Sequence, residues 1–283
     1  MCSSICPALY AWIEEHRPAL FARIQAQVAN GRWEVVGGMW IEPDLNLISG
    51  ESIARQIIYG QRYVKAKFGQ VSKVAWLPDT FGFCQQLPQF LQLGQIDYFV
   101  TQKFLWNDTN QFPHQIFWWQ SPDGSRVLSY MSAPIGEGIE PVKIAEYGHK
   151  WQASTGDHHA LWLCGVGDHG GGPTRDMLLV QQRWQTSPLC PAWNFTTVEK
   201  YLAPRATENL PVWADELYLE FHRGCYTTHA AQKKANRQAE DALYQAELWT
   251  TIEGILTGHC QTHPEIERAW KLALFNQIGR AHV

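Results

Sequence analysis

The sequence predicts an α/β fold, in which a parallel β-sheet or barrel carries helices on its outside and an all-helical segment follows. Short apolar runs typical of buried strands alternate with stretches of helical periodicity over residues 33–185. After Pro211 the composition changes, and residues 228–252 are rich in Ala, Gln, Glu and Lys. With 283 residues and 45% hydrophobic content, the chain is long enough to bury a sizeable core.

The first part of the chain shows helix and strand signals in order. Apolar residues recur three and four apart over residues 9–28, which predicts one amphipathic helix that stops at residues 30–31 (Asn-Gly). A short strand is expected at residues 33–36. Ser49 is a candidate N-cap for a helix over residues 50–68.

The middle of the chain continues this alternation. Four further strands are expected, at residues 71–76, 98–101, 126–131 and 160–164. Helices are expected at residues 85–93, before Gly94, and at residues 175–185, where Thr174 can serve as the N-cap.

Helical spacing dominates the last quarter, at residues 228–252 and 265–275. The change of character between residues 211 and 224 marks a domain boundary. We therefore expect one domain over residues 1–215 and a helical domain over residues 216–283.

Charge, hydropathy and cysteine usage exclude several classes of protein. The net charge is −4, which lacks the basic excess of a non-specific nucleic-acid binder. No run approaches the ~18 apolar residues of a membrane span, and no signal peptide is evident. Seven cysteines without a C-x-x-C pair predict reduced thiols and a cytoplasmic location.

Tryptophan is unusually frequent, with 14 residues in a chain of only 18% charged residues. Flat aromatic faces stack on the apolar C–H faces of sugar rings, so this composition hints at carbohydrate binding. A large aromatic core explains the same excess.

The segment 76–82 carries the first candidate catalytic group. A buried strand ends there at Asp79, followed by Phe81 and Gly82. In parallel α/β folds the carboxyl ends of the strands form the active-site face, so Asp79 is a candidate catalytic or metal-binding carboxylate. The alternative is an Asp that caps the next helix.

A second strand end runs into a glycine-rich loop over residues 163–174, with Asp168 and His169 at its centre. Dense glycines let the backbone approach a ligand closely, and both side chains can exchange protons or bind a metal. The alternative is a glycine-rich turn with an Asx cap.

Three other segments place polar groups beside aromatic rings. In residues 37–44, two carboxylates, one of them Asp44, stand near Trp40, which suits sugar hydroxyls next to a stacking face. Lys103 and Trp106 follow a strand. The junction segment 220–228 contains His222, for which a structural role is the simpler interpretation.

Together these motifs resemble the glycoside hydrolase family 38 α-mannosidases, in the family's order from about residue 31 to residue 277. The resemblance implies a seven-stranded β/α barrel that lacks its first strand here, then part of a three-helix bundle, with β-sandwich domains beyond. It also implies a retaining mechanism with a zinc ion in the sugar-binding subsite. The matching segments are residues 31–44, 49–56, 76–82, 165–174 and 222–230.

The resemblance also implies roles for individual residues. Asp79 is similar to the family's nucleophile, which also binds the zinc, and Asp168 to its general acid/base. Phe81 is similar to the aromatic residue that lines the mannose subsite. The substrate implied is an α-mannoside or a mannose-containing glycan, and a homo-oligomer is left open. Further sugar contacts are implied at Lys103, Trp40 and Tyr226.

The chain departs from the family's pattern at both ends. The family's H-x-D segment, which supplies two zinc ligands, does not occur, and neither does its F-H-D phrase after Gln277. Residues 278–283 are those that a sequencing adapter read in frame would encode, so we expect them not to be native. Zinc sites need three or four protein ligands, and Asp79 is the one that this chain keeps. We therefore expect a fragment that neither binds zinc tightly nor hydrolyses mannosides alone.

Two other functions are considered beside a mannosidase. A non-catalytic carbohydrate-binding module would use the tryptophan surfaces, but it would not need both Asp79 and Asp168. A metal-dependent hydrolase of the polysaccharide deacetylase type would need pairs of metal-binding histidines at helical spacing, which residues 1–215 lack.

Overall fold

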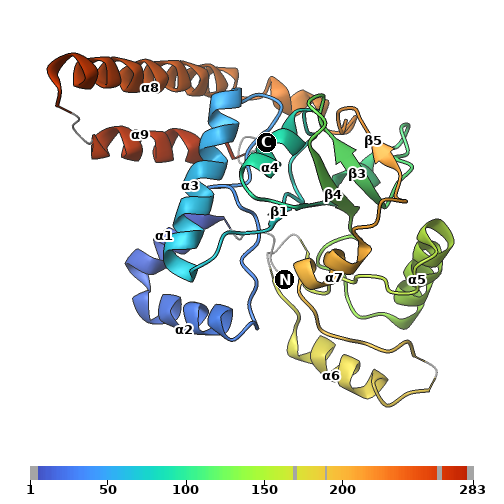
Figure 1. Cartoon of the computed structure of the whole chain (residues 1–283). Coiled ribbons are helices and arrows are strands. Elements are labelled where there is room, and N and C mark those ends of the chain that lie inside the picture. Colours follow the sequence, from blue (N-terminus) through green and yellow to red (C-terminus); the bar gives the residue numbers. More distant parts are fainter. Residues whose placement is uncertain (1–5, 168–170, 189, 260–262, 279–283) are drawn as a thin grey trace.

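The computed structural model describes residues 6–167, 171–188, 190–259 and 263–278. A five-stranded sheet lies among the helices (Figure 1). The helices α8 (Ala230–Thr257) and α9 (Pro264–Phe275) form a hairpin that projects beside α3 (Gly50–Phe68). The α/β class and the helical C-terminal part agree with expectation. Within the described residues, no helix is long and apolar enough to cross a bilayer.

The sheet has the strand order β1-β2-β4-β3-β5. Three neighbouring strands, β1, β2 and β4, run parallel, whereas β3 runs antiparallel to β4 and parallel to β5. The sheet is therefore mixed and not purely parallel as expected. The strands span Val74–Trp76 (β1), Tyr98–Thr101 (β2), Ile116–Gln120 (β3), Arg126–Met131 (β4) and Val212–Trp213 (β5).

The antiparallel strand β3 is absent from the sequence-based expectation. Only five residues, 121–125, join it to β4, and a connection this short permits an antiparallel hairpin but not a parallel crossover. Within the turn, the Ser121 N–H donates to the Ser125 carbonyl at 2.9 Å, and Gly124 takes a φ of +89°. The strands expected at 98–101 and 126–131 are confirmed.

The first predicted helix is two helices, α1 (Pro7–His16) and α2 (Pro18–Ala29). Pro18 has no N–H to donate and disfavours helical backbone at Arg17, which takes φ −143° and ψ 56°. Helix α3 begins and ends as expected, because the Ser49 hydroxyl accepts a hydrogen bond from the Ser52 N–H and Gly69 closes the helix in the left-handed conformation.

Two of the expected strands do not form. Residues 33–36 run beside β1, where the Gly37 N–H donates to the Val74 carbonyl at 2.8 Å, but they form no named strand. In the segment 160–164, Cys164 makes a single isolated bridge with Glu137. The seven-stranded barrel is therefore not confirmed by the described residues.

The remaining helices surround the sheet and its loops. Helix α5 was not expected, since its sequence carries a weak apolar stripe with only Ile144 and Trp151 buried. Helix α6 is capped by the Thr174 hydroxyl, which accepts from the Met177 N–H, as expected. These helices span Leu87–Leu93 (α4), Pro141–Thr155 (α5), Arg175–Trp184 (α6) and Val198–Leu202 (α7).

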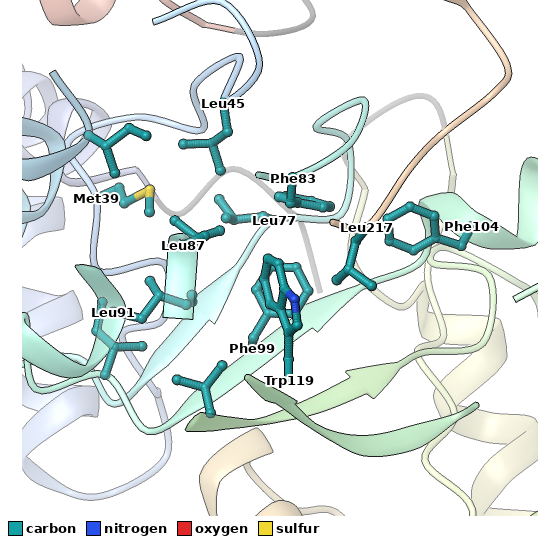
Figure 2. Close-up of a cluster of buried hydrophobic side chains, with 14 of the residues drawn as sticks. Met39, Leu45, Leu77, Phe83, Leu87, Leu91, Phe99, Phe104, Trp119 and Leu217 are labelled. Atoms are coloured by element: carbon teal, nitrogen blue, oxygen red, sulfur yellow. The ribbon is translucent and has the colours of Figure 1, made fainter. Parts of the chain in front are cut away.

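Much of the aromatic content lies in the core. Figure 2 shows one cluster, in which Phe99 of β2 and Trp119 of β3 meet Phe83 and side chains of α4. Trp119, Trp151 and Trp270 are almost completely buried. Several of the tryptophans therefore belong to an aromatic core, which is the second of the two explanations that the composition allowed.

A buried polar network joins the helical hairpin to α3. The Gln277 amide donates to the Ser52 hydroxyl at 2.9 Å and to the Glu240 carboxylate at 2.8 Å. The Gln56 amide donates to the Leu274 carbonyl at 3.0 Å. Because buried polar groups are costly when unpaired, this network fixes how the hairpin sits on α3.

Candidate active site

The carboxyl ends of three parallel strands define one edge of the sheet. Asp79 follows β1 by three residues, and Lys103 follows β2 by two. After β4, the Ile135 N–H donates to the Gln102 side chain at 2.8 Å, which ties that loop to the end of β2. Parallel neighbours end at the same edge, so the pairing of β1 with β2 brings these groups together.

Asp79 and Lys103 form an ion pair at this edge. The Lys103 Nζ lies 3.1 Å from Asp79 Oδ1, and the lysine side chain is 3% exposed while that of Asp79 is 20% exposed. The ammonium group also lies 4.0 Å from the ring centroid of Trp106 and 5.3 Å from that of Phe81. Two aromatic faces and a carboxylate thus compensate a buried cation.

Glu42 supports the turn that carries Asp79. One oxygen of its carboxyl group accepts from the Asp79 N–H at 2.6 Å, from the Thr80 N–H at 2.9 Å and from the Thr80 hydroxyl at 3.3 Å. Burial, together with the nearby charge of Asp79, raises the pKa of Glu42 to about 8. The sequence analysis noted Glu42 as one of the two carboxylates in residues 37–44, but it did not predict this supporting role.

Asp44 is engaged locally. Its carboxylate accepts from the Asn46 N–H at 3.1 Å, and its own N–H donates to the Gln277 carbonyl at 2.8 Å. The helical hairpin therefore holds the segment that carries Glu42 and Asp44.

Tyr226 reaches the same region from the junction segment. Its hydroxyl donates to the Phe81 carbonyl at 2.6 Å, and the Asn46 amide donates to that carbonyl and to the Tyr226 oxygen, each at 2.9 Å. Gly82 follows with a φ of +108°, and a Cβ there would lie 2.9 Å from the Asn46 amide nitrogen. Tyr226 and Asn46 thus fix the backbone between Asp79 and Gly82.

Glu220 fastens the junction segment to the loop that follows Trp106. It accepts from the backbone N–H groups of Thr109 and Asn110 and from the Asn110 amide, while its own N–H donates to the Asn107 side chain at 3.0 Å. Burial would raise the pKa of Glu220, but these hydrogen bonds outweigh it and lower the pKa to about 2. Sequence reasoning noted the segment but not this role.

Trp40 is buried against the helical hairpin. It is 7% exposed and packs with Trp270 and Leu274 of α9, in a cluster separate from that of Phe81. Lys271 of α9 lies over its ring at 5.3 Å. The structure thus gives Trp40 a packing role against the helical hairpin, and the sugar contact that the resemblance implies there stays a prediction.

Asp168 and His169 lie outside the described residues. The segment that leads to them is held at the same edge of the sheet, because the Gly167 N–H donates to the Gly136 carbonyl and the Gly136 N–H donates to the Leu163 carbonyl, each at 3.0 Å. Gly136 has a φ of +82°, and a Cβ there would lie 2.4 Å from Gly167. Only glycine permits this close approach.

The described residues do not by themselves fit a zinc site. Among them, no group of three or more His, Cys, Asp or Glu side chains is placed to hold a metal ion. One oxygen of Asp79 is already paired with the ammonium group of Lys103.

Comparison with known proteins identifies the class of protein to which this fold and site belong. The family model described as "Glycosyl hydrolases family 38 N-terminal domain" matches residues 2–216, and the model described as "Alpha mannosidase middle domain" matches residues 220–279. The chain therefore belongs to glycoside hydrolase family 38.

Among its curated relatives are alpha-mannosidase 2C1 of Homo sapiens, 38% identical over 94% of this chain, and an alpha-mannosidase of Saccharomyces cerevisiae, 35% identical over 95%. The chain spans 26% of the length of each. A solved alpha-mannosidase from Enterococcus faecalis V583 superposes with a TM-score of 0.71 at 22% identity, over 93% of this chain and 32% of that one. At this identity the likeness concerns the fold.

Proposed function

We propose that these residues form part of the catalytic site of a retaining α-mannosidase, with Asp79 as the nucleophile and Asp168 as the general acid/base. The observation that carries the proposal is the Lys103–Asp79 pair at the carboxyl edge of the sheet. The pair places a carboxylate, the group that a retaining nucleophile requires, at this edge. The surrounding aromatic faces suit the C–H faces of a sugar.

In this reaction the Asp79 carboxylate attacks the anomeric carbon while Asp168 donates a proton to the departing glycosidic oxygen, giving a mannosyl ester on Asp79. Water then attacks the anomeric carbon. It gives a proton to Asp168 and releases Asp79, so the configuration is retained. Asp44, Phe81, Trp106 and Tyr226 would line or support the sugar site. No step is routed through zinc, since the described residues do not supply a ligand set.

We further propose that residues 1–215 supply the catalytic domain and residues 216–283 part of a helical domain, a division supported by the matches to residues 2–216 and 220–279. We also propose that the longer protein to which these residues belong has a complete β/α barrel, a three-helix bundle, a zinc ion and an α-mannoside or mannose-containing glycan as its substrate. We propose that the 283 residues alone do not turn over mannosides, because they span 26% of those relatives. The cysteines among the described residues are thiols, and we propose a reducing, cytoplasmic setting for the chain.

Turnover of an aryl α-mannoside tests the proposed function. The longest gene product that contains these residues should release the aryl group from the α-mannoside but not from the β-anomer. Asp79→Ala and Asp168→Ala should abolish this turnover. Asp97→Ala is the matched control, because Asp97 pairs with Lys73 just before β2, at the other edge of the sheet. Full activity of Asp79→Ala would contradict the proposal.

A further inference from the structure

The carboxylate of Glu240 is the centre of the buried polar network between α8 and α3. Its side chain is 4% exposed, and its second oxygen accepts from the Arg237 guanidinium at 2.8 Å. The first oxygen accepts three hydrogen bonds, from the Ser49 N–H at 3.2 Å, the Ser52 hydroxyl at 2.7 Å and the Gln277 amide at 2.8 Å. Donors from the start of α3, from α8 and from the residues after α9 thus converge on one carboxylate.

Stability alone is a weak reason for a carboxylate in this position. Replacing buried ionic groups by apolar residues that fill the same space often leaves a protein equally stable. What a buried polar group supplies is one defined arrangement, because each of its hydrogen bonds has a preferred direction. The segments that Glu240 holds in a fixed arrangement are therefore informative.

The network continues to both sides of Glu42. The Gln277 backbone carbonyl accepts from the Asp44 N–H at 2.8 Å. On the other side, the side-chain oxygen of Gln56 accepts from the Ile41 N–H at 3.1 Å, and the Gln56 amide donates to the Gln277 side-chain oxygen at 3.2 Å. Glu42 thus lies between two N–H groups that are anchored to the network.

The anchored segment in turn holds the turn that carries the proposed nucleophile. The Glu42 carboxyl group accepts from the N–H groups of Asp79 and Thr80, and the Pro43 carbonyl accepts from the Thr80 hydroxyl at 3.0 Å. Two consecutive residues of the segment therefore fasten two consecutive residues of the turn. A shift of the segment would move the Asp79 carboxylate, and even small misplacements of a reacting group slow catalysis.

We propose that Glu240 is a positioning residue for the nucleophile, acting through Gln277 and the segment 41–44 on the turn at Asp79. This inference rests on the proposed function and deepens it, because it gives helix α8 a role in catalysis. Glu240 lies in the network between the helices and not at the reacting carboxylates. Its loss should therefore slow the reaction in each folded molecule, and not only lower the fraction of molecules that are folded.

Three variants separate positioning from helix packing. Glu240→Leu removes the acceptor, whereas Glu240→Gln keeps an oxygen for the same donors, since the half-exposed Arg237 can turn to water. Glu247→Leu is the matched control, because Glu247 also joins α8 to α3, through a hydrogen bond from Arg55 at 2.8 Å. Thermal unfolding by circular dichroism should show all three variants folded at room temperature.

Hydrogen exchange of the 283-residue chain, measured by mass spectrometry, tests whether the network reaches the turn. We expect Glu240→Leu to speed exchange of the Asp79 and Thr80 amides by about tenfold, because these hydrogen bonds then open more readily. Glu240→Gln and Glu247→Leu should leave this exchange within roughly twofold of that of the unmodified chain. A purely structural role would change exchange in the helices but not at the turn.

A milder variant serves if Glu240→Leu does not fold. Ser52→Ala removes the hydroxyl that donates to Glu240 and accepts from Gln277, while its N–H still donates to the Ser49 cap. We expect Ser52→Ala to speed exchange at the turn by about threefold, since it removes fewer hydrogen bonds.

The effect on catalysis is measured in the longest gene product that contains these residues. The kcat for an aryl α-mannoside, referred to the folded fraction, should fall by about tenfold in Glu240→Leu, with a smaller change in KM. Glu240→Gln should restore most of kcat, and Glu247→Leu should leave it unchanged.

Equal exchange at the turn in Glu240→Leu and Glu247→Leu would overturn the inference. An unchanged kcat in Glu240→Leu, or equal losses of kcat in the two leucine variants, would overturn it as well. Each of these results leaves the proposed function standing, and that function fails separately, by full turnover in Asp79→Ala.

Discussion

The Lys103 ammonium group lies 3.1 Å from the carboxylate of Asp79, although the two residues follow different strands and the lysine is 3% exposed. A buried lysine is costly unless it is paired, and here a carboxylate and two aromatic faces surround it. Because Asp79 is the proposed nucleophile, this pair is the electrostatic centre of the candidate site.

Replacing Lys103 by methionine keeps the apolar stem and removes the charge. We expect Lys103→Met to lower kcat/KM for an aryl α-mannoside by on the order of 100-fold, as for other preorganised charges at reacting groups. Lys103→Arg should retain part of the activity. Lys73→Met removes the more exposed Lys73–Asp97 pair and should have no effect on kcat/KM. Equal losses in the two methionine variants would contradict this assignment.

Glu42 should act through its acceptor oxygen. Glu42→Leu leaves the N–H groups of Asp79 and Thr80 without their partner, at a cost of about 1–3 kcal/mol for each unpaired group. Glu42→Gln keeps an acceptor oxygen, and we expect it to retain most of the stability. Urea unfolding of both variants at pH 7 measures the difference, and the expectation fails if Gln destabilises as much as Leu.

Glu220 should make the free energy of unfolding of the chain depend on pH. The pKa of about 2 lies below the value of about 4.3 for an unfolded Glu, so the carboxylate stabilises the fold above about pH 5, and this stabilisation is lost as the pH falls toward 2. Glu220→Gln should therefore be less stable than the unmodified chain at pH 7, and the gap should shrink steadily below pH 5. Glu208→Gln, at an exposed position, serves as the control in urea unfolding at each pH. A gap that does not change with pH would contradict the expectation.

Gly136 should be intolerant of any side chain. Alanine there is strained at φ +82°, and its Cβ would lie 2.4 Å from the backbone of Gly167. Gly124→Ala meets the same kind of strain at φ +89° with nothing within 4 Å. We expect a cost of about 1–2 kcal/mol at Gly124 and ~1–3 kcal/mol more at Gly136, measured by urea unfolding. Equal costs would show that the loop before Asp168 does not pack as described.

The sequence signals that correctly predicted where helices begin are local ones. Ser49 and Thr174 accept hydrogen bonds from the N–H groups three residues on, so their helices begin where the capping pattern places them. Pro18 breaks the helix because it has no N–H to donate. The break was not predicted, because the apolar spacing continues on both sides of Pro18 and carries no information about a missing N–H. Strand β3 was missed because its pairing depends on the turn at residues 121–125 and on β4, not on its own composition.

At the candidate site, sequence reasoning placed Asp79 and Lys103 each after a strand, and the parallel pairing of β1 with β2 explains why they lie near each other. Their direct pairing could not be predicted, because it depends on side-chain direction across two loops. Trp40 shows the same limit, since only the docking of α9 reveals that its ring is buried. Glu42 and Glu220 act by accepting backbone hydrogen bonds, for which an isolated carboxylate in a sequence gives no signal.

The most direct test of the central claim is covalent trapping of the nucleophile. A fluorinated mannosyl substrate that hydrolyses slowly should be incubated with the longest gene product containing these residues, followed by proteolysis and mass spectrometry. Our account predicts a single mannosyl ester on the carboxylate of Asp79, absent in Asp79→Ala and present in Asp97→Ala. A mannosyl label on another residue, or turnover without any label on Asp79, would contradict it.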